Sequence, residues 1–65
     1  MSHSHSSARE RRALIMKMLE KENEISVTSL SKELGISEVT IRKDLTNLQN
    51  RNLLVRTRGG AIRRP

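Results

Sequence analysis

Apolar residues recur every three or four positions in the first third of the chain. Leu14, Ile15, Met18 and Leu19 follow this spacing, and basic side chains fill positions between them. A period near 3.6 residues is typical of a helix that buries one face. The pattern therefore predicts a helix from residue 8 to about residue 23.

Two shorter helical patterns follow, and a tight turn separates them. Residues 24–27 alternate between polar and apolar, which predicts a short strand. Thr28 is expected to cap a second helix that ends at Gly35, and Ser37 to cap a third helix that continues to residue 49 or 50. Asn52 is expected to be left-handed and to end the third helix. The core face of that helix is expected to hold Ile41, Leu45 and Leu48.

The C-terminal segment, residues 53–64, reads as two short strands around a tight turn. Gly59 and Gly60 at its centre predict a two-residue hairpin turn. In that register Arg56 faces Arg63 across the strands. Like charges directly opposite each other are destabilising, so the arrangement suits a hairpin that lies beside a phosphate.

These elements predict one small α+β domain that is mostly helical, a three-helix winged helix-turn-helix with a short β-hairpin wing. A chain of 65 residues has room for a single domain, which we place at residues 9–65. The helix-turn-helix spans about residues 25–44 and the wing about residues 53–64. Residues 1–8 are polar and are expected to form a disordered leader of the kind that cloning adds.

Charge points to the class of partner. Thirteen Lys and Arg against seven Asp and Glu give a net charge of +6, which is typical of proteins that bind a polyanion. Five arginines and no acid lie within residues 51–65, whereas residues 20–38 hold five of the seven acids. Modules for single-stranded nucleic acid usually stack bases on aromatic side chains, and this chain has none. Double-stranded DNA is therefore the expected partner.

Several other classes of protein are disfavoured. The chain has no cysteine, and its longest apolar run is the four residues 13–16, so we expect a cytoplasmic protein with no disulfide, no cysteine-based zinc site and no membrane segment. His3 and His5 could chelate a metal, but this is the weaker interpretation of a polar leader. No metal, cofactor or enzymatic activity is expected, because no nucleophile, base and orienting group can be assembled.

The face of the third helix opposite its apolar side carries the candidate DNA contacts. Base contacts usually come from the start of a recognition helix, where Arg and Lys reach guanine and Glu accepts from cytosine. Hydroxyl groups, exposed amides and wing arginines suit phosphate. For each residue alone, a helix cap or a solvated charge is the alternative. The predicted base readers are Glu38, Val39, Arg42 and Lys43. The predicted backbone contacts are Ser26, Thr28, Ser37, Thr40, Arg56 and Arg58.

Two motifs resemble the N-terminal domain of the DeoR family of bacterial repressors. Residues 37–45 read Ser-x-x-Thr-Ile-Arg-Lys-Asp-Leu, and residues 59–61 read Gly-Gly-Ala. The likeness covers about residues 9–63. The chain departs from the family pattern at three positions, where arginine, glycine and histidine are common: Lys43, Asn52 and Arg58.

The resemblance implies that Thr40, Arg42, Lys43 and the wing face DNA. It also implies a transcriptional regulator, a repressor of sugar metabolism genes, whose C-terminal domain, absent from this chain, senses a sugar phosphate and forms homo-oligomers. The isolated domain is then expected to be monomeric. The alternative function is a winged-helix module that docks an acidic protein partner.

Overall fold

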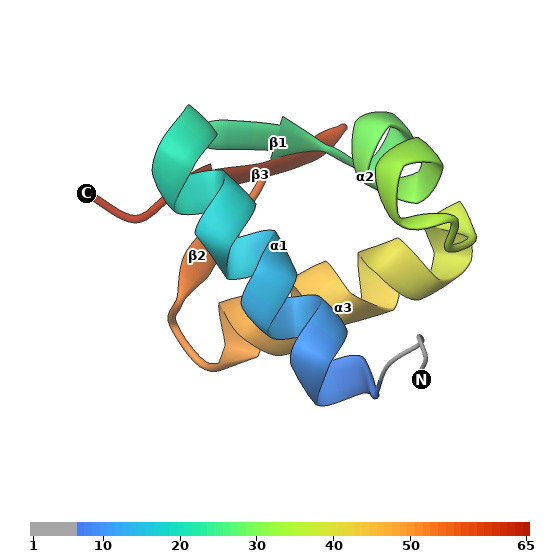
Figure 1. Ribbon diagram of the computed structural model, residues 1–65. Coiled ribbons are helices and arrows are strands. Elements are labelled where there is room, and N and C mark those ends of the chain that lie inside the picture. The colour runs from blue at the N-terminus through green and yellow to red at the C-terminus, as the bar shows by residue number, and fades with distance from the viewer. Residues whose placement is uncertain (1–6) are drawn as a thin grey trace.

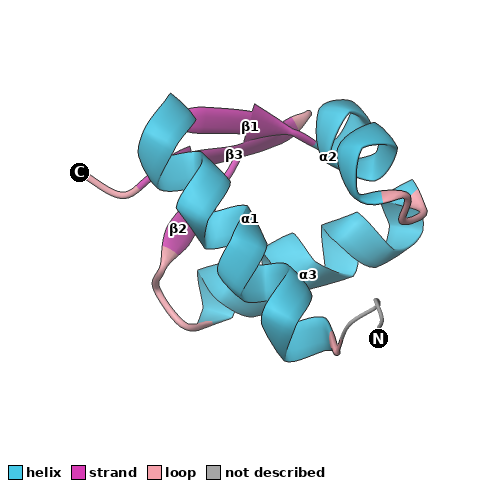
Figure 2. Cartoon of the chain, in the orientation of Figure 1, coloured by secondary structure: helices cyan, strands magenta, loops and turns pink. Residues whose placement is uncertain are grey.

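A computed structural model describes residues 7–65 (Figure 1). Three helices and three short strands lie within this part of the chain, in the order α1 (Ala8–Glu22), β1 (Glu24–Ser26), α2 (Val27–Leu34), α3 (Glu38–Asn50), β2 (Leu54–Arg56) and β3 (Gly60–Arg63). Figure 2 shows α1 crossing α3, and α2 beyond the end of β1. The predicted class, a mostly helical α+β domain with a winged helix-turn-helix, is confirmed.

Serine side chains cap the starts of all three helices. Ser7 and Ser37 each accept a hydrogen bond from the amide three residues on, at 3.2 Å and 3.3 Å. The cap of α2 is Ser26, whose Oγ accepts from the corresponding amide at 3.0 Å. The prediction of Thr28 as that cap is wrong, because the helix begins at Val27 and Thr28 lies in its first turn.

The N-terminal leader lies almost entirely outside the described residues. Residues 1–6, with His3 and His5, are not among them. Ser7 caps α1 and Ala8 is its first residue, so both belong to the start of the helix.

Left-handed residues follow the helices, as the sequence indicated for two of them. Gly35 has a φ of 66° and ends α2, and Asn52 has a φ of 62° shortly after α3. Asn23, with a φ of 70°, ends α1 in the same way. The short side chain of asparagine tolerates this conformation, which other L-residues rarely adopt.

The strands form an antiparallel sheet in the order β1-β3-β2. The central strand, β3, therefore pairs with β2 of the wing and also with β1. Arg56 faces Ala61, and Arg63 faces Leu54. The predicted pairing of Arg56 with Arg63 is therefore wrong, and no arginine faces another arginine across β2 and β3. The turn lies one residue earlier than expected, at residues 58–59, and is closed by a hydrogen bond from the amide of residue 57 to the carbonyl of residue 60, at 3.0 Å.

Gly60 explains this register. Strand β1 approaches so closely that a Cβ on Gly60 would lie 1.8 Å from the carbonyl oxygen of Ile25. Gly59 has nothing within 4 Å of the corresponding position, and neither glycine has a positive φ. The second glycine of the pair is thus required for strand pairing.

Gly60→Ala is expected to destabilise the domain by about 1–3 kcal/mol, since β1 and β3 must separate to admit the methyl group. Gly59→Ala is the matched control. We expect it to leave the stability of the domain unchanged or to raise it by about 0.4–1 kcal/mol, because alanine lowers the conformational entropy of the unfolded chain. Urea denaturation of both variants measures the difference. Equal midpoints for the two variants would contradict this account of Gly60.

The core lies between the three helices and the sheet. Leu14, predicted on the buried face of the first helix, is 44% exposed instead, and Met18 is half-buried. Ile15 and Leu19, four residues apart on one line along the helix, point fully inward, and the neighbouring line of Leu14 and Met18 lies at the edge of the buried face. The buried apolar residues are Ile15, Leu19, Val27, Leu30, Ile41, Leu45, Leu48, Leu54 and Ala61.

Candidate nucleic-acid interface

The outer face of α3 is exposed along its length. The face opposite is buried through Ile41, Leu45 and Leu48, as predicted. Val39 is 60% exposed although it is apolar, and Arg42 and Lys43 are also exposed. Two cations on the outer face of one helix suit a surface that meets a polyanion.

Glu38 lies at the start of this face and holds Arg42. A guanidinium nitrogen of Arg42 donates to Glu38 Oε1 at 3.0 Å, one helical turn away. Thr28 donates to the other carboxylate oxygen at 3.4 Å. An exposed pair of this kind stabilises a helix by only about 0.3–0.5 kcal/mol. Arg42 can therefore leave Glu38 for a stronger acceptor at little cost.

Arg56 joins the wing to one flank of α3. Its guanidinium donates to Thr46 Oγ1 at 2.9 Å, and its amide donates to Gln49 Oε1 at 2.8 Å. Its Nε is buried and has no partner among the described residues. Arg58 is exposed at the turn of the hairpin. The wing thus presents one arginine that is held by α3 and a second that is exposed at the hairpin turn, next to the start of α2.

A buried carboxylate ties α1 to α3, and the sequence analysis missed it. Asp44 is only 1% exposed. Arg11 donates to it through Nε and through Nη2, the latter at 2.9 Å, and Arg12 donates through Nε at 3.1 Å. The hydrogen bond to Asp44 raises the pKa of Arg11, against the lowering effect of burial. A signal was present, because Asp44 falls on the same helical face as Ile41 and a charge there requires a buried partner.

Ser26 lies apart from the other candidates. It lines a cleft of about 340 Å³ between α1, β1 and α2, with Glu22, Glu24 and Glu33 in the same wall. Three carboxylates make this cleft unfavourable for a phosphate. Thr28, by contrast, contacts the start of α3, and Ser37 and Thr40 lie there too, joined by a hydrogen bond of 3.1 Å between their hydroxyl groups.

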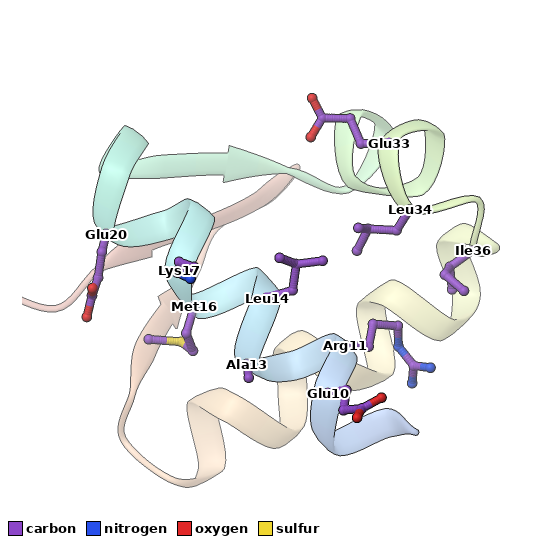
Figure 3. Close-up of a pocket in the computed structure, with 10 residues that line it drawn as sticks. All are labelled: Glu10, Arg11, Ala13, Leu14, Met16, Lys17, Glu20, Glu33, Leu34 and Ile36. Atoms are coloured by element: carbon purple, nitrogen blue, oxygen red, sulfur yellow. The ribbon is translucent and has the colours of Figure 1, made fainter. Parts of the chain in front are cut away.

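A second hollow, of about 850 Å³, lies between α1 and α2 (Figure 3). Leu14 and Leu34 point toward one another across it, while Glu20 points away. None of the ten candidate DNA contacts lines it. Within residues 7–65 no helix is long and apolar enough to cross a membrane, and no three His, Cys, Asp or Glu side chains gather where a metal could bind.

Comparison with known proteins gives a family match. The family model described as a DeoR-like helix-turn-helix domain matches residues 11–64. The chain is 43% identical over 53 residues to the HTH-type transcriptional regulator GlpR of Haloferax volcanii, a segment that is 82% of this chain and 21% of the relative. None of the solved structures gives a significant match.

Two further relatives have names that state opposite effects on transcription. Identity is 42% over 53 residues to a putative aga operon transcriptional repressor of Escherichia coli O157:H7, covering 82% of this chain and 20% of the relative. It is 43% over 49 residues to the L-fucose operon activator of Haemophilus influenzae, covering 75% and 20%. The chain spans about a fifth of the length of these curated relatives. With its family match over residues 11–64, the chain belongs to the DeoR-like helix-turn-helix family of DNA-binding transcription regulators.

Proposed function

We propose that this domain reads double-stranded DNA in a sequence-specific manner, with α3 in the major groove and the hairpin wing against the adjacent backbone. The observation that carries the proposal is the exposed face of α3, where two cations and an apolar side chain lie together beside Arg56 of the wing. In a helix-turn-helix this is the helix that enters the groove.

The base readers are assigned to the start of α3. Arg42 can bind guanine once it leaves Glu38, and Lys43 supplies a point charge where arginine would form a planar fork. Val39 suits contact with a thymine methyl group, and Glu38 suits cytosine. The backbone contacts are assigned to Thr28, Ser37, Thr40, Arg56 and Arg58. Ser26 remains the least supported candidate, because it shares its cleft with three carboxylates.

We infer that the domain serves a regulator of sugar metabolism genes, a repressor, acting in the cytoplasm. The names of two relatives refer to the aga and L-fucose operons. Those relatives extend well beyond the matched segment, which leaves room in such a regulator for a domain that binds a sugar phosphate and forms homo-oligomers. Two copies of the domain that bind a repeated DNA sequence would supply the sequence specificity that a single domain lacks. We assign no catalytic role, because a DNA-binding regulator domain is not a class of enzyme.

Fluorescence anisotropy with a random-sequence duplex tests DNA binding directly. We expect binding at low salt that weakens as the salt concentration rises, because phosphate contacts release counterions. Selection from a random duplex pool is then expected to yield sequences that bind about a thousandfold more tightly or better than the starting pool, the lower end of specific discrimination. A chain with no affinity for duplex DNA at low salt would contradict the proposal and favour a winged-helix module that docks an acidic protein.

A further inference from the structure

The contact between α1 and α3 carries more positive charge than it neutralises. Asp44 supplies one negative charge, and Arg11 and Arg12 both donate to it. Arg9, one turn before Arg12, is exposed and adds a third cation to this edge of α1. Part-buried like charges repel one another unless an anion balances them. The surplus therefore makes this edge suited to a second anion.

The two arginines that share Asp44 differ in what they leave available. Arg11 uses two nitrogens on the carboxylate, and its side chain is 17% exposed. Arg12 uses only Nε, and its side chain is 28% exposed. Its two terminal nitrogens make no hydrogen bond with any residue of the range 7–65. Arg12 is thus held in place by Asp44 while its terminal nitrogens remain available to an acceptor.

The position of this arginine relative to α3 suggests which acceptor. At 3.6 residues per turn, Thr46 and Gln49, which meet Arg56 of the wing, lie on one side of the exposed face of α3. Asp44, which holds Arg12, lies on the other side. A helix in the major groove runs between two phosphate backbones. The wing can reach only the backbone on its own side.

We propose that Arg12, positioned by Asp44, binds a backbone phosphate on the flank of α3 opposite the wing. This inference rests on the proposed function and adds a contact outside the helix-turn-helix and the wing. The wing and α1 then hold the duplex from both sides of the recognition helix. Such a contact positions the domain and carries no base preference.

Arg12→Gln is expected to lower the slope of log affinity against log salt concentration by about 0.9, the value for one lost phosphate contact. Affinity for random and for selected duplexes is expected to fall by the same factor. Lys17→Gln is the matched control, since it removes one exposed charge from the same helix at the hollow between α1 and α2. Arg12→Lys keeps the charge and is expected to retain the slope.

An unchanged slope in Arg12→Gln, or an equal loss in Lys17→Gln, would overturn the inference while the unsubstituted chain still binds DNA. Absence of duplex binding by the unsubstituted chain would overturn the proposed function as well. If Arg12→Gln does not fold, the Nε–H resonance of Arg12 in the native chain decides the matter. It is expected to shift when a short duplex is added. A resonance of Arg12 that stays in place would contradict the contact.

Discussion

Replacing both Arg42 and Lys43 with alanine is expected to abolish the sequence preference of DNA binding and to leave the fold intact. Both side chains are exposed and neither contacts the core, so the circular dichroism spectrum should not change. A good bidentate contact from arginine to guanine discriminates by about 1–3 kcal/mol, and a lysine contact adds to it. Competition between selected and random duplexes measures the ratio of affinities, which should approach one.

The matched control is the double substitution of Lys17 and Lys21 with alanine. It removes the same charge from exposed positions on α1. We expect it to weaken binding slightly at low salt and to preserve the ratio between selected and random duplexes. If the Arg42 and Lys43 double variant keeps that ratio, these residues are not the base readers.

Asp44→Asn is expected to cost about 3–5 kcal/mol of folding free energy, the range for removing one partner of a buried ion pair. The amide is nearly the same size, but it carries no charge and leaves two part-buried guanidinium groups without a counterion. Domains of this kind are stable by about 5–15 kcal/mol, and a small one lies at the lower end. Urea denaturation followed by circular dichroism should show a much lower midpoint.

Glu38→Gln provides the comparison for that variant. It breaks the other carboxylate–arginine pair of α3, which is exposed, and it should change stability by no more than about 0.5 kcal/mol. If Asp44→Asn unfolds at the same urea concentration as Glu38→Gln, the buried ion pairs of Asp44 do not contribute about 3–5 kcal/mol to the stability of the domain.

The wing shows most clearly which features its sequence predicts and which it does not. A Gly-Gly pair between two strand-like segments indicated the hairpin correctly, yet it placed the turn one residue too late. Turn preferences depend only on neighbouring residues. The register instead depends on β1, which lies far back in the sequence and needs Gly60 for its close approach. No pattern within the hairpin itself contains that information.

Some features of the candidate interface could also be predicted from the sequence, whereas others required the tertiary structure. The period of α3 correctly indicated that Ile41, Leu45 and Leu48 face the core and that the opposite face is exposed, but it did not reveal that Asp44 is buried. That Glu38 holds Arg42 was also accessible in principle, since the two are one turn apart. The bond from Arg56 to Thr46 and the grouping of Ser26 with three carboxylates required the arrangement of separate elements.

The sequence by itself determined the helices, the Ser37 cap, the left-handed Gly35 and Asn52, and the exposed face of α3. These features depend on residues within about one helical turn of each other, so the local chain encodes them. Only the tertiary structure decided the register of the wing and the partners of Asp44, because Arg11 and Arg12 lie 33 and 32 residues away from it. Packing brings such residues together, and for that reason the basic edge of α1 emerged only from the fold.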